Sequence, residues 1–421
     1  MKITRALAWF LSGAALMATN VPALAADATL VIESWRNDDL PIWQEKIIPA
    51  FEKSHPGIKL TFRPTAPKEY NAALNSKLDA GTAGDIIACR PFDASLELFK
   101  KGLLANAQDV PGIGKFSPFA RAAWSTDDGK TTFCVPVAAV LGGFIYNKDA
   151  FEKAGIAQPP ATVDEFFAVL DKIKADGTYI PLAMGTADQW EAATMGYQNI
   201  GPNYWRGEDG RRALIEGKQK LTDPQWLAPL QQLARWAPYM GEGYQAQSYP
   251  DSQNLFTLGR AAIYPAGSWE IAPFQSQAQF KMGVFPPPVP KAGDQCYISD
   301  HVDIAFGMNG KSSHPEAART FLAWVASPEF AQLYSSALPG FFSLQTGATE
   351  QADPLAKAFA AWRETCKPTI RSTYQILSRG VPNLENETWG AAANVINGTE
   401  KPEQAAQRLQ KGLDSWYKRA N

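Results

Sequence analysis

Apolar and polar positions near the start of the chain follow two different periods. Residues 29–35 form a continuous, strand-like run that leads into a polar loop at 36–39. Between residues 41 and 54, apolar positions that include Ile47 and Phe51 recur at helical spacing. The pattern therefore predicts a strand, a loop and an amphipathic helix.

The same change of period repeats in the next stretch. The sequence His-Pro-Gly at 55–57 ends the first helix, and residues 58–62 alternate like a strand. A second helix is predicted for 68–80, and 85–89 has the composition of a short buried strand. This strand–helix–strand–helix–strand order predicts an α/β fold with a parallel sheet and right-handed crossovers.

Two later helices are marked by signals at their ends. Thr162 and Glu165 have the spacing of a capping box, and Gly177 stands where that helix is expected to end. Ser313 and Glu316 predict a second capping box. Helices are thus also predicted in the middle and later parts of the chain.

The stretch 259–269 carries the most distinctive single aromatic residue. Residues 261–264 are predicted to form a short strand that ends at Pro265. Gly267 then permits a tight turn with positive φ, which presents Trp269 from the end of a loop. A ring placed there can stack on an apolar ligand face while its N–H donates a hydrogen bond. The alternative is an ordinary core tryptophan.

Composition bounds the class of protein. A chain of 421 residues exceeds one ordinary core, so two domains are expected. Net charge is −2 and no basic run occurs, so electrostatics gives no support for binding to nucleic acid or to anionic membranes. The 13 Trp and 13 Tyr residues suit carbohydrate, whose C–H faces stack on rings, although most of them are expected to serve packing.

The N-terminus has the pattern of a secretory signal peptide. Lys2 and Arg5 precede an apolar stretch at 6–18 that is too short to span a bilayer. Ala-Leu-Ala at 23–25 is a cleavage pattern, so residues 1–25 are predicted to be removed. No cysteine adjoins that site, which argues against a lipid anchor. We expect export to a bacterial periplasm.

Four cysteines remain after this cleavage. An even count in an oxidising compartment permits two disulfides, and three pairings of Cys89, Cys134, Cys296 and Cys366 are open. The sequence contains no CxxC pair and no Cys/His cluster, so we expect neither a metal nor a cofactor.

Several blocks in order resemble one family. Ile48-Pro-Ala-Phe-Glu-Lys53, Ala80-Gly-Thr-Ala-Gly-Asp-Ile-Ile87, the block 144–156 and Pro159-Pro-Ala-Thr-Val-Asp-Glu-Phe166 are similar to blocks of the family-1 extracellular solute-binding proteins, the sugar-binding subunits of ABC importers. The match runs from about residue 29 to the C-terminus, and the Gly-Ser-Trp of the 259–269 stretch agrees with it. The first cleft loop and the turn at Cys89-Arg90-Pro91 depart from the maltose-binding member, so specificity cannot be copied from it.

The resemblance implies a two-lobed periplasmic-binding-protein fold of type II. Each lobe is then a mostly parallel sheet flanked by helices, and the lobes are joined by a three-crossing hinge. The N-terminal lobe is expected to comprise 26–138 plus 291–327, and the C-terminal lobe 139–290 plus 328–421. Crossings are expected near 138–143, where Gly142 and Gly143 offer backbone freedom or a static turn, near 286–295 and near 327–330.

The cleft of such a fold lies at the ends of strands, and the candidate ligand-binding residues come from there. Carboxylates and guanidinium groups suit hydroxyl recognition, and indoles suit stacking. The candidates are Trp35, Arg36, Asn37, Asp38, Arg90, Asp93, Gln189, Trp190, Trp269, Asp300, His301 and Trp389.

One cluster invites a catalytic interpretation. His301 lies between Asp300 and Asp303, but it lacks metal-ligand spacing and no GxSxG serine accompanies it. We therefore interpret Asp300 and His301 as partners of sugar hydroxyls, while Arg371 matches the family poorly. Two cleft arginines, Arg36 and Arg90, either favour an acidic, sulfonated or phosphorylated sugar or pair with Asp38 and Asp93.

The resemblance implies a non-enzymatic, monomeric binding protein. It captures a mono- to oligosaccharide by hinge closure and delivers it to the membrane permease subunits of an ABC transporter. A secreted glycoside hydrolase, which needs two opposed carboxylates, is an alternative. A binding protein for a non-sugar polar solute such as a glycerol phosphate is another.

Overall fold

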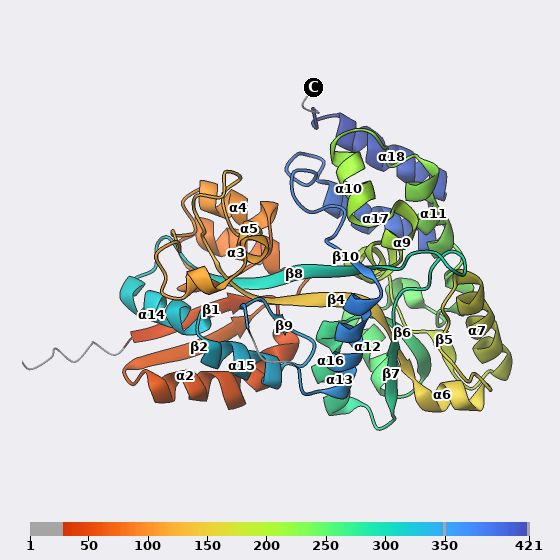
Figure 1. The fold of residues 1–421 in the computed structure, drawn as a ribbon, viewed down its shortest axis with the longest axis horizontal. Coiled ribbons are helices and arrows are strands. Elements are labelled where there is room, and N and C mark those ends of the chain that lie inside the picture. The colour runs from red at the N-terminus through yellow and green to blue at the C-terminus, as the bar shows by residue number, and fades with distance from the viewer. Residues whose placement is uncertain (1–27, 348–350, 419–421) are drawn as a thin grey trace, which may run out of the picture.

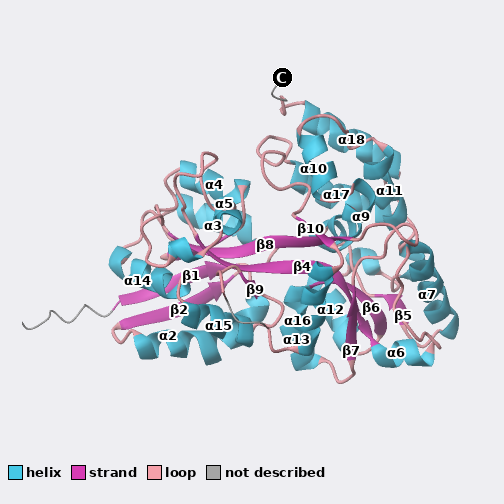
Figure 2. Cartoon of the chain, viewed as in Figure 1, coloured by secondary structure: helices cyan, strands magenta, loops and turns pink. Residues whose placement is uncertain are grey.

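The computed structural model describes residues 28–347 and 351–418. The predicted signal peptide, residues 1–25, lies outside the described residues. Two groups of helices lie at opposite ends of two long central strands, β4 (Val135–Asn147) and β8 (Tyr297–Met308) (Figure 1). Figure 2 shows strands running through both halves with helices around them.

The strands and helices are short relative to the chain. The other strands are β1 (Ala28–Ser34), β2 (Ile58–Pro64), β3 (Ile86–Cys89), β5 (Ile180–Leu182), β6 (Ala261–Gly267), β7 (Met282–Phe285), β9 (Phe342–Ser343) and β10 (Lys367–Thr369). The α-helices are α1 (Leu40–Ile42), α2 (Ile48–Ser54), α3 (Tyr70–Asp79), α4 (Asp93–Lys100), α5 (Pro118–Ala122), α6 (Lys148–Lys153), α7 (Val163–Asp176), α8 (Gln198–Ile200), α9 (Pro202–Trp205), α10 (Glu208–Ile215), α11 (Pro224–Leu233), α12 (Tyr249–Thr257), α13 (Ile271–Gln277), α14 (Pro315–Val325), α15 (Pro328–Ala337), α16 (Pro354–Ala361), α17 (Leu384–Ile396) and α18 (Pro402–Asp414).

The strands form one mixed sheet path. Its order is β2-β1-β3-β8-β4-β6-β5, with β7 and β9 on β4 and β10 on β8. β1 pairs in parallel with β2 and β3, which confirms the predicted start of the chain. β8 is antiparallel to β3 and β4, and β4 is antiparallel to β6, so the middle of the path departs from a parallel sheet. The mixed α/β class is the one that the sequence predicts.

Proline shapes the first predicted helix. The helical run covers Leu40 to Ser54, but residues 43–47 form a π-helical turn between α1 and α2. Pro49 follows this turn, and a proline both lacks an N–H donor and crowds the carbonyl four residues earlier. The wider turn relieves that crowding. The helix α7 is closer to expectation, since the Thr162–Glu165 capping box and the left-handed Gly177 are both present.

Aromatic stacks fill both lobes. In the first lobe, Trp43 stacks on Phe62 with ring centroids 4.4 Å apart. In the second, Trp205 stacks on Trp226 at the same separation. These four rings are buried, so part of the tryptophan content serves packing.

The expected hinge positions fall on particular elements. Residues 138–143 lie inside β4, and 286–295 lead into β8. The expected third crossing at 327–330 is the turn between α14 and α15, and α15 contacts the π-helical turn of the first lobe. Helix α16, which contacts β7 and β4, lies toward the other end of the long strands, with the second group of helices (Figure 1). The chain therefore passes from the first lobe to the second after α15.

Packing explains why glycine stands at positions 142 and 143. A Cβ on Gly142 would lie 2.8 Å from Oδ1 of Asn199, and one on Gly143 would lie 2.5 Å from the Trp362 ring. Neither residue has a positive φ. Close approach of neighbouring side chains, rather than backbone freedom, requires glycine in β4.

The two disulfides secure the starts of the long strands. They join Cys89 to Cys134 and Cys296 to Cys366, which selects one of the three pairings. Cys134 directly precedes β4, and Cys296 directly precedes β8.

Two local predictions are wrong. β6 runs through Pro265 to Gly267, and Gly267 has φ −110° rather than a positive value. Pro265 fits in the strand because its missing N–H is not needed opposite Phe144. The capping box predicted at Ser313 is also absent, since His314 occupies the N-cap of α14 and its side chain makes no capping hydrogen bond to the helix backbone.

Candidate functional site

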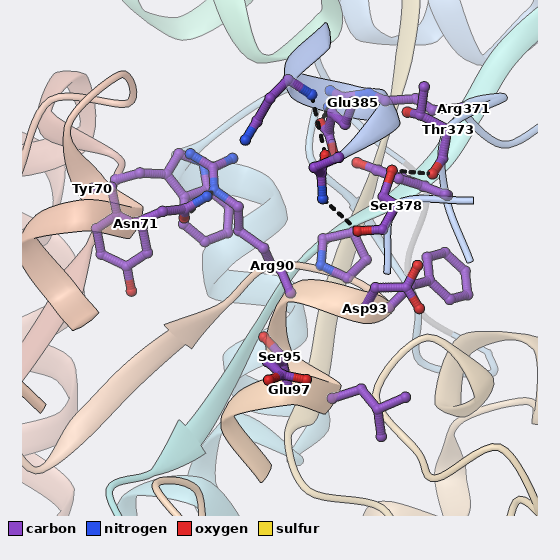
Figure 3. Close-up of a pocket in the computed structure, with 18 of the residues that line it drawn as sticks. Tyr70, Asn71, Arg90, Asp93, Ser95, Glu97, Arg371, Thr373, Ser378 and Glu385 are labelled. Atoms are coloured by element: carbon purple, nitrogen blue, oxygen red, sulfur yellow. Dashed lines mark hydrogen bonds and ion pairs between the residues drawn. The ribbon is translucent and has the colours of Figure 1, made fainter. Parts of the chain in front are cut away.

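A cavity of about 580 Å³ lies between the two lobes. Figure 3 shows side chains of both lobes around it, including Arg90 from the segment after β3 and Glu385 from α17. Its lining combines rings with charged and amide groups, among them Trp35, Tyr70, Asn71, Arg90, Asp93, Trp190, Tyr249, Trp269, Asp303, Arg371, Tyr374, Glu385 and Trp389.

The twelve candidates divide into two sets. The residues that line the cavity are Trp35, Arg36, Arg90, Asp93, Trp190, Trp269 and Trp389. The residues that do not are Asn37, Asp38, Gln189, Asp300 and His301.

The first lobe presents a stacked pair at the end of its strands. Arg90 lies over the Trp35 ring, 4.4 Å from its centroid, and Tyr70 meets the same indole edge-on. The Arg90 guanidinium donates to Oδ1 of Asn71 at 3.1 Å and to the Pro67 carbonyl at 3.2 Å. Both acceptors are neutral, and no carboxylate among the described residues forms an ion pair with Arg90. Burial lowers the pKa of Arg90, as expected for a guanidinium without such a partner.

Arg36 is already neutralised. Its Nε and Nη2 donate to the two carboxylate oxygens of Asp39 at 2.9 and 2.7 Å. Both side chains are buried, 6% and 1% exposed, so neither charge has water to replace its partner. Arg36 borders the cavity as half of a structural ion pair.

Trp269 is held by an unusual close approach. A Cβ on Gly267 would lie 1.8 Å from the Trp269 ring, so glycine is required for space. The indole N–H donates to Oε1 of Glu270 at 3.1 Å, which fixes the ring while it lines the cavity.

A buried carboxylate stands behind this ring. Glu270 is fully buried and accepts hydrogen bonds from Tyr249 at 2.7 Å and from Gln253 at 3.0 Å. Burial raises the pKa of Glu270 to about 7, against the lowering effect of those bonds, and the charge of Asp38 adds to the increase. Trp190 packs edge-on against Tyr249, with ring centroids 4.7 Å apart, and so shares this support.

Three charged side chains that line the cavity make few contacts with other protein groups: Asp303, Arg371 and Glu385. Asp303 lies on β8, and within the described residues its carboxylate accepts no hydrogen bond and only approaches the His301 ring at 3.9 Å. Arg371, after β10, lies 3.9 Å from Glu385, and its buried Nε has no hydrogen-bond partner. Burial raises the pKa of Asp303, while Arg371, Arg36 and Arg90 oppose that increase. These groups remain available to a ligand.

Four of the other five candidates have structural partners instead: Asp300, His301, Asn37 and Asp38. Asp300 is held by Arg363 through two hydrogen bonds of 2.7 and 2.8 Å at the surface. His301 is buried against Ser299, and burial holds its pKa well below the usual value.

The remaining three lie near the cleft without lining the cavity. Asn37 donates to Asp38, and Asp38 accepts from Gln253 at 3.4 Å. Gln189 is exposed in a turn with positive φ. Proximity in sequence to a cleft residue was therefore not enough to place these side chains.

The sequence reasoning missed several lining residues. Tyr70 and Tyr249 belong to helices whose apolar pattern matches core positions, and Asp303 lies inside a 12-residue strand. Tyr374 and Glu385 had no pattern that could have identified them. Arg371 was noticed but set aside for its poor match.

The described residues offer neither a metal site nor a membrane-spanning helix. No group of three or more His, Cys, Asp or Glu among them has the geometry to hold a metal ion. None of the helices in the described part of the chain is long and apolar enough to cross a membrane.

Two helix-flanked lobes, joined by long shared strands, surround a cavity whose size suits a small-molecule ligand. The sequence pattern of bacterial extracellular solute-binding proteins matches residues 46–363, and the chain belongs to that family. The predicted family and fold class are thereby confirmed.

Individual relatives agree with this assignment. An uncharacterized ABC transporter extracellular-binding protein of Pyrococcus horikoshii is 28% identical over 243 residues, 57% of this chain and 56% of that protein. The multiple sugar-binding protein of Streptococcus mutans is 23% identical over 301 residues, 69% of each chain. The match thus spans about half the length of the first relative and about two thirds of the second.

Solved structures share the fold. A chitin oligosaccharide binding protein superposes with a TM-score of 0.78 at 20% identity, covering 92% of this chain and 98% of that one. A Bacillus licheniformis sugar transporter solved with stachyose gives 0.72 at 18% identity, covering 91% and 98%. Identities this low establish the architecture alone.

Proposed function

We propose that this protein is the periplasmic binding subunit of an ABC importer and that it captures a sugar between its lobes. The observation that carries the proposal is the cavity of about 580 Å³, in which indole and phenol rings stand beside Asp303, Arg371 and Glu385, three charged side chains that make no hydrogen bond to the described residues. The names of relatives support it, since they include a multiple sugar-binding protein and an ABC transporter binding protein.

The cavity chemistry suits a polyhydroxylated ligand. Trp190, Trp269 and Trp389 supply faces for C–H surfaces, at ~1 kcal/mol per stacked ring. Asp303 accepts from hydroxyls, and Arg90 donates to them, at about 1 kcal/mol net per hydrogen bond. Micromolar affinity corresponds to about −8 kcal/mol, and association itself costs at least about 4 kcal/mol, so about a dozen contacts of this size are needed.

The proposal includes a hinge motion about β4 and β8. A ligand that bridges surfaces of both lobes makes more contacts in the closed form than in the open form. It therefore favours the closed form by the difference between its binding free energies for the two forms. The domain division 26–138 plus 291–327 and 139–290 plus 328–421 remains part of this proposal, amended so that α15 stays with the first lobe. Export through residues 1–25, delivery to permease subunits and a monomeric state are proposed with it.

We infer a binding role without catalysis. A glycoside hydrolase needs two opposed carboxylates. Asp93 is engaged by Arg379. Asp303 and Glu385 share the cavity with the guanidinium group of Arg371. Membership of the solute-binding family supports the binding role. Absence of sugar release from oligosaccharides is expected, and detectable release would reverse the assignment.

A thermal-shift screen tests the proposal. The panel contains mono-, di- and oligosaccharides, sugar acids and glycerol phosphate, because ligand that binds the folded state must raise the melting temperature. Trp190→Ala should reduce the shift given by a hit, since the loss of one stacked ring weakens affinity about fivefold, while Trp226→Phe, at a buried packing residue outside the cavity, should retain it. A shift from no saccharide in a broad panel would overturn the proposal.

A further inference from the structure

Residues 371–383, here called the strap, connect β10 to α17 along the mouth of the cavity. The strap is fixed to the second lobe near its start. The Ser372 amide donates to Oε1 of Gln198 at 2.9 Å, and Nη1 of Arg211 donates to the Tyr374 carbonyl at 3.3 Å. Beyond these anchors, Ser378 and Arg379 lie on the cavity lining (Figure 3 labels Ser378).

Arg379 reaches from the strap to the other lobe. Its Nε donates to Oδ1 of Asp93 at 2.7 Å, at the first residue of α4. Nη1 and Nη2 donate to the two carboxylate oxygens of Asp127 at 3.1 and 2.7 Å. Three charge-assisted hydrogen bonds therefore cross the mouth of the cavity, and the fork geometry of arginine suits them.

A second charged contact closes the cleft elsewhere. Nζ of Lys68, just before α3, lies 3.0 Å from Oδ1 of Asp188 in the second lobe. The other oxygen of Asp188 accepts from the Tyr249 amide at 2.8 Å, so this carboxylate is held in place. Neither of these pairs involves the stacking faces of the cavity tryptophans.

We propose that Arg379 is a latch that sets the balance between open and closed forms before ligand arrives. The proposal rests on the hinge motion of the proposed function. The Arg379 bonds exist only when the lobes approach each other, so they stabilise the closed form alone. In this assignment Asp93 is a latch residue, not the ligand contact that its position in the sequence suggested.

Solvent exposure predicts how the latch responds to salt. The side chains of Arg379, Asp127 and Asp93 are 33%, 58% and 10% exposed. Pairs with this much exposure are screened as ionic strength rises. Loss of the latch is expected to lower the closed-to-open ratio about fivefold, because an ion-pair network with this exposure stabilises a structure by about that factor.

Single-molecule energy transfer between the lobes measures that ratio without any ligand. The native cysteines are paired in disulfides, so Phe119→Cys on α5 and Lys411→Cys on α18 are the two labelling sites. The variants are Arg379→Gln, Asp127→Asn and Arg379→Lys. The matched control is Lys59→Gln, which removes a 2.8 Å ion pair to Glu52 inside the first lobe.

The expected result has three parts. Arg379→Gln and Asp127→Asn lower the closed-to-open ratio about fivefold at low salt, and Lys59→Gln leaves it unchanged. At 0.5 M NaCl the wild-type ratio approaches that of the latch variants. Arg379→Lys restores part of the ratio, because lysine keeps the charge without the fork.

Equal ratios for wild type and both latch variants at low salt would overturn the latch. So would an equal response from Lys59→Gln. If the latch variants open while no saccharide shifts the melting temperature, the latch stands and the sugar assignment fails. If saccharides bind while the latch variants match wild type, the proposed function stands and the latch fails.

Discussion

Glu270→Gln should make the stability of this protein less dependent on pH. Glu270 is fully buried behind Trp269, and burial raises its pKa from 4.5 to about 7. Between these values the folded state keeps the proton while the unfolded state has lost it. The folded state then binds more protons, so the free energy of unfolding falls as pH rises through this window.

The size of the effect follows from the pKa shift. One pKa unit corresponds to about 1.4 kcal/mol, so ionised Glu270 costs about 3 kcal/mol of stability above pH 7. Glutamine does not ionise and can still accept from Tyr249 and from the Trp269 indole. Gln253 donates to the other carboxylate oxygen at 3.0 Å and to Asp38 at 3.4 Å, so in the variant it loses the first acceptor and keeps the second.

Urea unfolding of wild type and Glu270→Gln at pH 5, 6, 7 and 8 measures the difference. We expect the variant to gain about 2.5 kcal/mol relative to wild type between pH 5 and pH 8, since the rest of the total effect falls below pH 5. The control is Glu216→Gln, where the Lys218 hydrogen bond lowers the pKa and places the titration below this range. The measured quantity is the free energy of unfolding of Glu270→Gln minus that of wild type. A difference that stays constant from pH 5 to 8, or that increases as pH falls, would refute the reasoning.

Three further predictions concern a disulfide, the glycine beside Trp269 and the buried Arg36–Asp39 ion pair. Cys89→Ala/Cys134→Ala should lower the free energy of unfolding by about 4 kcal/mol, because the bond closes a loop with a sequence separation of 45; an unchanged urea midpoint would contradict this. Gly267→Ala should cost about 1–3 kcal/mol and weaken binding of any sugar hit, since the new Cβ occupies the place of the Trp269 ring; calorimetry showing wild-type affinity would count against it. Arg36→Met should destabilise the fold by about 3–5 kcal/mol at pH 7 by leaving Asp39 buried and charged, and Arg36→Met/Asp39→Leu should recover most of that loss; thermal unfolding decides whether it does.

Elements with a strong local period could be predicted from the sequence. The first strands and the capping box of α7 depend on contacts within a few residues, and they formed where expected. Side chains directly after a strand, such as Trp35 and Arg90, were also placed correctly at the cavity edge, because the ends of parallel strands meet there.

Features that depend on distant neighbours could not be predicted. Gly267 is required by the ring of Trp269 rather than by its own φ, and no sequence period reveals such an approach. His301 and Asp303 lie two residues apart on β8, yet only Asp303 lines the cavity. The pairing of β8 with β4 shifts register at residues 136–139, and the sequence carries no sign of that irregularity.

The ion pairs of the cleft could not be predicted from the sequence either. The pairs that form also bear on whether the ligand is acidic or neutral. The sequence left open whether cleft arginines address an acidic ligand or pair with Asp38 and Asp93. In the structure Arg36 pairs with Asp39, and Asp93 is taken by Arg379, so neither expected pair forms.

The charges left to a ligand are then two of each sign. Arg90 and Arg371 stand against Asp303 and Glu385, and only Arg371 and Glu385 approach each other, at 3.9 Å. A single anionic group would gain from the two guanidinium groups but would meet the carboxylates in the same space. Hydroxyl groups, which both donate and accept, can satisfy all four at once. Replacing Asp303 by asparagine should therefore shift the preference of the site toward sugar acids in the thermal-shift panel, whereas an unchanged ranking would show that Asp303 does not face the ligand.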